Sequence, residues 1–180
     1  MVYLKSIIAA AFTSILALGA APLAAQNEGS QRQAAAPQMV TQFDAATVSR
    51  LLLDVSATWQ TEPSVDGHTN YRASAAGGLN FTVSPRACSE QYGCLGLMML
   101  AVYTDVSAPN MAALDTFLNQ LNDTSTSVKV FRNAGGIIVL QAYINAAGGI
   151  TYRNAQSELL IFGQDIVAVS QAIAQFEQQQ

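Results

Sequence analysis

Few side chains in this sequence could carry metal, redox or acid–base chemistry. His68 is the single histidine, and Cys88 and Cys94 are the two cysteines, separated by five residues. A histidine can act as a metal ligand or a general base, but His68 follows Asp66-Gly67 and is interpreted as a solvated residue at a turn. We therefore assign no catalytic, cofactor-binding or metal-binding residue from the sequence.

The short motifs typical of enzymes are missing from the sequence. It contains no Gly-x-Ser-x-Gly, His-x-x-x-His or Ser-x-x-Lys motif and no phosphate-binding loop. Glycine pairs occur at 77–78, 135–136 and 148–149, but their surroundings are typical of turns. The acidic residues are scattered singly, without a close pair that could serve as general acid and base. We interpret the chain as non-enzymatic, with no cofactor.

The N-terminus has the layout of a secretory signal peptide. Lys5 supplies the positive charge, residues 6–21 form an uncharged apolar run, and small residues precede the polar Gln26. We expect cleavage between Ala25 and Gln26, which would remove residues 1–25 and leave a bacterial periplasmic or secreted protein. An uncleaved anchor is the alternative, although the run is shorter than the roughly 18 to 20 apolar residues that span a bilayer.

The two cysteines are interpreted as a structural disulfide. An even number of cysteines in an exported chain is expected to be oxidised, which favours a Cys88–Cys94 bridge. A redox pair or a pair of metal ligands is the alternative. A thioredoxin-like pair has two intervening residues, and zinc requires further cysteine or histidine ligands nearby.

Composition argues for a folded domain and against nucleic-acid binding. Hydrophobic residues make up 51% of the chain and charged residues 11%, which is enough apolar material for a core. Without residues 1–25, seven Lys and Arg face twelve Asp and Glu, a net charge of −5. Because phosphate would be repelled, we expect no nucleic-acid partner. Contact with a membrane is expected only through the signal peptide before its cleavage.

Hydrophobic periodicity predicts an α+β domain with the element order α-β-β-β-α-β-β-α. Apolar residues at helical spacing predict helices over residues 43–59, 110–122 and 151–176. Apolar runs between turn residues predict five strands, over residues 68–74, 79–84, 94–103, 126–132 and 137–144.

The domain is expected to span residues 43–176, between a flexible linker at 26–42 and a frayed tail at 177–180. Asp44 and Thr151 are the expected N-caps of the first and last helices. Trp59 is expected to close the apolar stripe of the first helix and to pack in the core.

A glycine in the last helix and the segment around the third strand also lead to specific expectations. Gly163 is expected to weaken the last helix by about 1 kcal/mol relative to alanine and also to mark a close packing contact. Residues 85–93 are expected to form a loop framed by the cysteines. The following strand, residues 94–103, is apolar on both faces, so we expect helices on one face and a second cover on the other. That cover is either the chain's own helices or a second subunit.

From Asn110 onward the sequence resembles the YbjN-domain family of bacterial proteins. The resemblance depends on a helix that ends in Asn119-Gln120-Leu121-Asn122, the strand 128–131, a glycine hairpin, an apolar strand and a long helix opened by residues 148–151. The cysteine pair before the third strand also resembles exported members. Leu121 stands where the family's tryptophan is expected, and the hairpin turn at 133–136 lacks the family's acidic residue.

The resemblance implies a curved antiparallel sheet flanked by helices, similar to type III secretion chaperones and often dimeric. It also implies a sensory-transduction regulator, and it brings no catalytic residues. We therefore expect a non-enzymatic domain that binds a protein or peptide through the sheet face or an exposed strand edge. Alternatives are a small-ligand sensor with a pocket between sheet and helices, a hydrolase with an unfamiliar site at His68, and a homodimer that covers the apolar face.

Overall fold

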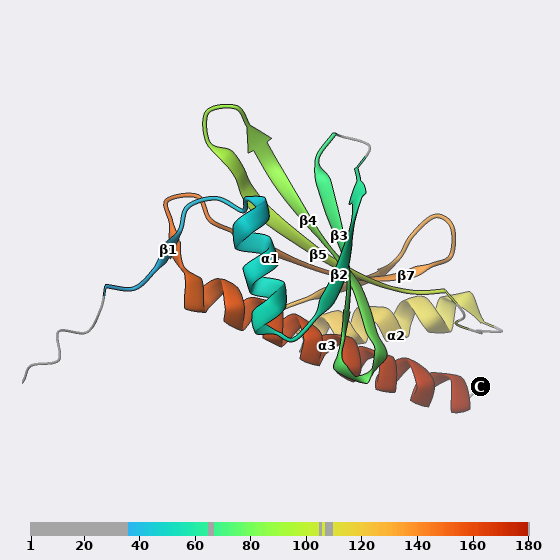
Figure 1. Ribbon diagram of the computed structural model, residues 1–180. Helices are drawn as coiled ribbons and strands as arrows, with labels where there is room; N and C mark the ends of the chain where they lie inside the picture. Colours follow the sequence, from blue (N-terminus) through green and yellow to red (C-terminus); the bar gives the residue numbers. More distant parts are fainter. Residues whose placement is uncertain (1–35, 65–66, 105, 107–109, 180) are drawn as a thin grey trace, which may run out of the picture. The chain divides into compact units, whose positions relative to one another are not determined.

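The computed structural model describes residues 36–64, 67–104, 106 and 110–179 (Figure 1). The expected signal peptide, with its cleavage site between Ala25 and Gln26, lies outside these residues, as does most of the expected linker. The end of that linker is corrected, because Met39–Val40 form strand β1. β1 pairs with the short strand β8, Ile150–Thr151, and the Val40 side chain is buried in the core.

A six-stranded antiparallel sheet and three helices make up the domain, which confirms the α+β class (Figure 1). The spatial order of the strands is β2-β3-β4-β5-β7-β6, and each neighbouring pair is antiparallel. The prediction of five strands is wrong by one. The strands are β2 Thr58–Pro63, β3 Thr69–Ala75, β4 Leu79–Ser89, β5 Gly93–Tyr103, β6 Lys129–Arg132 and β7 Ile138–Asn145.

The additional strand, β2, arises because the first helix ends earlier than predicted. Helix α1 spans Ala45–Asp54 and begins at the expected cap, where the Asp44 Oδ1 accepts a hydrogen bond of 2.7 Å from the Thr47 N–H. The chain leaves the helix after Asp54 and turns at Ser56, whose φ of 56° lies in the left-handed region. The chain then turns into β2, so Trp59 lies opposite Ala73 of β3 and packs beside the core from a strand.

The predicted loop at 85–93 is also wrong, because β4 and β5 extend through it to a short turn at residues 90–92. Pro85 interrupts the pattern expected of a strand, since proline cannot donate a ladder hydrogen bond. In this sheet Pro85 pairs with Leu97 of β5, whereas the pairing of β4 with β3 ends at Val83. Pro85 is therefore tolerated at a position where one side of β4 has no paired strand.

All three helices contribute to one core against the same face of the sheet. Helix α2, Met111–Thr124, buries Leu114 and Leu118, and helix α3, Tyr152–Gln178, buries seven side chains along its length. The sheet supplies the alternate residues of each strand, among them Val83, Met99 and Leu140. Side chains from both layers therefore form one hydrophobic cluster.

Helix α3 has the length and hydropathy of a membrane span, but seven of its side chains are buried in the core, whereas Leu160, Ile161 and Val167 are exposed. Thr151 caps it as predicted, because its hydroxyl accepts a hydrogen bond of 3.1 Å from the Asn154 N–H. At its centre, the hydroxyl of Tyr103 in β5 donates a 2.9 Å hydrogen bond to the carbonyl of Ile166. The close packing contact expected at Gly163 is wrong, since a Cβ there would have nothing within 4 Å.

Candidate functional site

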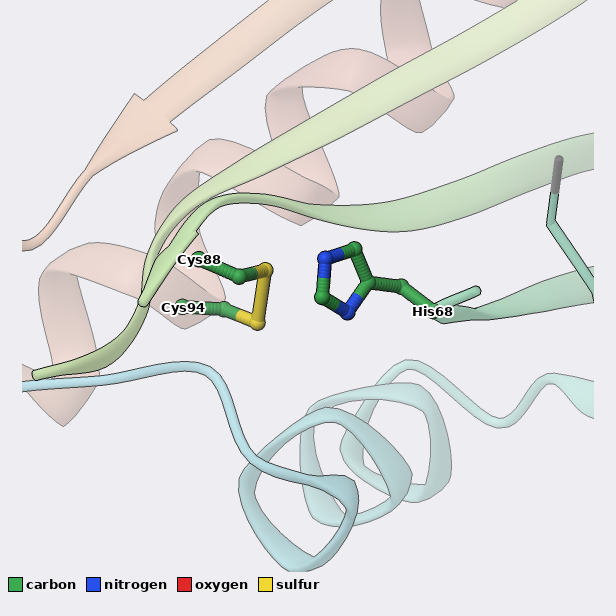
Figure 2. A group of neighbouring side chains, drawn as sticks. All are labelled: His68, Cys88 and Cys94. Carbon is green, nitrogen blue, oxygen red and sulfur yellow. A yellow bond between two sulfur atoms is a disulfide. The ribbon is translucent and has the colours of Figure 1, made fainter. Parts of the chain in front are cut away.

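The histidine and both cysteines of the chain meet beside the hairpin of β4 and β5 (Figure 2). Cys88 and Cys94 lie directly opposite each other in the β4–β5 ladder and are joined by a disulfide. His68 directly precedes β3, and its imidazole ring lies beside the disulfide. The ligand atoms of the three residues, all half-buried, lie within 4.8 Å of one another.

The disulfide closes a small ring within an already paired hairpin. The ladder continues on both sides of it, with Ser89 opposite Gly93 and Arg86 opposite Gly96. The loop-entropy model gives a ring of this size roughly 2 kcal/mol of stability. The disulfide therefore adds a small stabilisation to a turn that backbone pairing between β4 and β5 also stabilises.

His68 was predicted to be a solvated residue at a turn, and it lies at a bend but is half-buried. Its carbonyl oxygen accepts a 2.7 Å hydrogen bond from the Ser64 N–H, which fixes the backbone where the chain enters β3. The proximity of His68 to the cysteines was missed, because it depends on how β3 aligns with β4. The only signal in the sequence was that one histidine and two cysteines all lie near the same end of neighbouring predicted strands.

The opposite face of the sheet is a second candidate site, because none of the described helices packs on it. Side chains alternate along β5, so Met99 and Ala101 are buried beneath the helices while Val102 points to the other face and is 60% exposed. Tyr143 of β7, also on this face, is 50% exposed. We call this face, formed by the outward residues of β2, β3, β4, β5 and β7, the open face. Of the two covers considered for this face, the chain's own helices are excluded for the described residues, and a second subunit is not tested.

A hollow of about 630 Å³ lies on the open face. Beside it, Tyr143 lies across Gly96, where any side chain would collide with the tyrosine hydroxyl. The hollow combines hydrogen-bonding groups of β3 and β4 with apolar side chains of β5. Its lining residues are Asn70, Arg72, Asn80, Phe81, Thr82, Ser84, Arg86, Leu100 and Val102.

Polar contacts order the side chains of this hollow. The Ser84 hydroxyl, which is buried, donates a 2.7 Å hydrogen bond to the Asn70 Oδ1. The Arg72 guanidinium forms an ion pair of 2.8 Å with Glu62 of β2, and an exposed pair of this kind adds little stability. The lining itself contains two arginines and no acidic residue. Arg72 is thus already paired with Glu62, and the Arg86 guanidinium donates a 2.9 Å hydrogen bond to the Pro85 carbonyl. The hollow therefore suits a ligand that offers apolar groups together with hydrogen-bonding groups.

The two edges of the sheet differ. The outer edge of β6 is blocked by Asn122 of α2, whose amide donates to the Val130 carbonyl and whose oxygen accepts from the Val130 N–H, both at 2.7 Å. In the strand order, β2 lies at the other end and pairs only with β3. The edge of β2 is therefore the one at which a further strand could be added to this sheet.

The groups with clearly shifted pKa values lie away from the hollow. Burial raises the pKa of Tyr103 to about 12, and burial with a hydrogen bond to Asp54 raises the pKa of Tyr152 to about 12. A hydrogen bond from Arg132 lowers the pKa of Asp115. These three side chains join helices to strands or to one another. Strongly shifted groups often mark functional sites, but here they serve packing.

A smaller apolar hollow, of about 280 Å³, lies between helix α3 and the end of the sheet. Val55, after α1, and Leu79 and Phe81 of β4 line one side of it. Leu160 and Val167 of α3, both partly exposed, line the other. This position, between sheet and helices, is where a small-ligand pocket was expected.

The sequence matches a family model described as YbjN, "Putative bacterial sensory transduction regulator", over residues 38–174. Those residues include all three helices except the last residues of α3, and all the strands of both sheets. Among curated proteins, none matches the sequence closely enough to count as a relative.

Proposed function

The chain belongs to the YbjN family, and we propose that it is a regulatory domain that binds an extended segment of a partner protein on its open face. The family's description fits a regulatory role. The observation that carries the proposal is an uncovered sheet face on which Val102 and Tyr143 are exposed and Val102 lines a hollow of about 630 Å³. Exposed apolar residues grouped on one face are typical of interaction sites.

The chemistry of the hollow defines the partner segment. Leu100 and Val102 offer apolar contact, and the polar side chains of β3 and β4 that line the hollow, among them Asn70 and Thr82, offer hydrogen bonds. The segment that fits is therefore an extended stretch of another protein that carries both apolar and hydrogen-bonding side chains. Binding along strands in this way would be chaperone-like, in line with the fold similarity implied by the family resemblance.

Export is part of the proposal. The layout of residues 1–25 and the expected cleavage between Ala25 and Gln26 support a periplasmic or secreted location. The Cys88–Cys94 disulfide supports an oxidising compartment, because such bonds persist there and are rare in the cytosol. Fusing residues 1–30 to alkaline phosphatase tests this: enzyme activity is expected with the native residues and not when Leu16 is replaced by Arg.

Substitution of Val102 tests the binding face. The Val102→Asp chain is expected to lose a partner that the wild-type chain retains from envelope extract, because a carboxylate would enter the apolar side of the hollow. Leu53→Asp is a matched control, since Leu53 on α1 is similarly exposed, at 63%. Equal recovery with both variants, or loss with Leu53→Asp alone, would contradict binding at the open face.

A small-ligand sensor is the second candidate, and the apolar hollow beside α3 favours it. A ligand that binds only the folded chain raises its melting temperature. Such a ligand is expected to lose its effect when Gly163, which lines this hollow, is replaced by Leu. If the rise in melting temperature persists in Gly163→Leu but is lost in Val102→Asp, the ligand binds on the open face instead.

A further inference from the structure

Every histidine and cysteine of the chain lies in one cluster, although three separate segments supply them. His68 precedes β3, Cys88 lies near the end of β4, and Cys94 lies near the start of β5 (Figure 2). The alignment of three strands, and not closeness in sequence, brings the imidazole to the sulfur atoms. These residue types are the nitrogen and sulfur ligands that zinc takes in proteins.

We propose that this cluster is a redox-gated zinc site. While the Cys88–Cys94 disulfide is intact, its sulfur atoms are bonded to each other and cannot act as thiolate ligands. When the disulfide is reduced, two thiolates and the His68 imidazole become the three protein ligands of one Zn²⁺ ion. Three protein ligands leave the fourth tetrahedral position to water.

The distances in the cluster suit this arrangement. In tetrahedral zinc, bonds of about 2.3 Å to sulfur and about 2.0 Å to nitrogen place the ligand atoms roughly 3.5 to 3.8 Å apart. The atoms of the cluster already lie within 4.8 Å of one another. On reduction the sulfur atoms need only separate from their bonded distance, which rotation about the Cα–Cβ bonds can supply.

The backbone around the cluster is held independently of the disulfide. Ser89 opposite Gly93 and Arg86 opposite Gly96 keep β4 and β5 aligned on both sides of the cysteines. The hydrogen bond from the Ser64 N–H to the His68 carbonyl fixes the approach to β3. Reduction is therefore expected to free the thiols without moving the ligands apart.

The redox step is a dithiol–disulfide exchange followed by metal binding. A dithiol reductant supplies two electrons and two protons, the Cys88–Cys94 bond breaks, and the reductant leaves as its own disulfide. Zn²⁺ then replaces the two thiol protons, which pass to solvent, and forms two Zn–S bonds and one Zn–N bond. Soft thiolate ligands favour zinc over magnesium or calcium, which take oxygen ligands.

Zinc titration of the full-length chain in both redox states tests the site. A chromophoric chelator competes for Zn²⁺ after the reductant is removed under anaerobic conditions, and Co²⁺ absorption reports thiolate ligation. The reduced wild-type chain is expected to bind one Zn²⁺ per chain and to show thiolate-to-cobalt absorption, whereas the oxidised chain is expected to show neither. Zn²⁺ is also expected to raise the melting temperature of the reduced chain alone.

Substitutions identify the ligands. His68→Ala and His68→Gln are each expected to weaken zinc binding in the reduced chain by more than about tenfold, since even outer contacts of a metal site are worth that much. The Cys88→Ser/Cys94→Ser chain is expected to bind no Zn²⁺ in either state. Asp123→Asn, on the exposed side of α2, is the control for surface binding and is expected to leave the affinity unchanged. Circular dichroism checks that each variant is folded.

Several results would overturn the proposal. Equal zinc binding by oxidised and reduced wild-type chains would show that the disulfide does not gate the metal, and this comparison requires no variant. Unchanged affinity in a folded His68 variant would remove the histidine from the site. Slower disulfide reduction in that variant, with unchanged zinc affinity, would assign His68 to thiol exchange instead.

Discussion

Tyr103 links the centre of the sheet to the centre of α3 through one hydrogen bond, from its hydroxyl to the Ile166 carbonyl. A buried tyrosine that donates this bond must stay protonated. Burial accordingly raises its pKa from 10.0 to about 12. The apolar run of residues 94–103 predicted that Tyr103 lies in a strand, but it could not identify a carbonyl 63 residues away as its partner.

Stability is therefore expected to depend on Tyr103 at alkaline pH. The folded chain holds the proton more tightly than the unfolded chain, so this stabilisation is complete below pH 10 and is lost as the pH rises from about 10 to 12. Tyr103→Phe is expected to cost about 1 kcal/mol at pH 7, from the lost hydrogen bond. It should also reduce the fall in stability above pH 10, although Tyr152 keeps part of that fall.

Urea unfolding at a series of pH values measures both effects. Tyr92→Phe is the control, because Tyr92 lies exposed in the β4–β5 turn. Identical alkaline slopes for Tyr103→Phe and the wild-type chain would rule out Tyr103 as a source of the dependence.

At the scale of elements, the end of α1 shows what the sequence could and could not predict. Val48, Leu51, Val55 and Trp59 continue a helical spacing, which led the prediction past the true end at Asp54. The Ser56 N–H bonds to the Leu53 carbonyl and the Ala57 N–H to the Leu52 carbonyl. This is the Schellman ending, in which glycine usually occupies the left-handed position. Because Ser56 is not a residue that typically ends a helix, the sequence did not indicate the end of α1, and strand β2 was not predicted.

Glycine at this position is expected to stabilise the domain. Ser56 has a φ of 56°, which is unfavourable for a residue with a Cβ. Ser56→Gly is expected to raise the free energy of unfolding by up to about 1 kcal/mol, partly offset by the greater freedom of glycine in the unfolded chain. Ser56→Ala, which keeps the Cβ, should bring no such gain. Thermal unfolding of the three chains decides, and a clear loss of stability in Ser56→Gly would contradict the assigned backbone conformation.

The helix end Asn119-Gln120-Leu121-Asn122, which carried the family resemblance, has a structural role at the edge of the sheet. Asn122 satisfies both backbone groups of Val130, so the edge of β6 is closed by a side chain of α2. The sequence predicted the helix and the strand but not this contact. Side-chain contacts of this kind depend on how an element packs, which periodicity does not specify.

Removing the Asn122 amide is expected to loosen this edge. Asn122→Ala should lower the free energy of unfolding by about 1 to 3 kcal/mol, because it leaves two partly buried backbone groups without their partner. Asn119→Ala, three residues earlier on the exposed side of α2, makes the same change in helix propensity and is the matched control. Denaturant unfolding compares the two, and equal effects would show that the contact contributes nothing beyond helix propensity.

At the scale of the whole domain, the sequence predicted which strand residues are apolar, but it did not predict what covers each face of the sheet. The apolar pattern of residues 94–103 predicted correctly that helices cover one face of β5. It also predicted a cover for the other face, where the described helices leave Val102 and Tyr143 exposed. A sequence shows which residues avoid water, but it does not show whether another part of the chain or another molecule covers them. The central proposal, that a partner protein covers this face, follows from that difference.

Site-specific photocrosslinking in the native cell tests whether a partner protein covers the open face. A photoreactive residue replaces Val102 on the open face in one chain and Leu53 on α1 in another, two positions that are similarly exposed, at 60% and 63%. A crosslinked product that contains a different protein is expected from position 102 and not from position 53. A product of two copies of this chain at position 102 would identify a homodimer instead. The same product from both positions, or products from position 53 alone, would contradict a partner site on the open face.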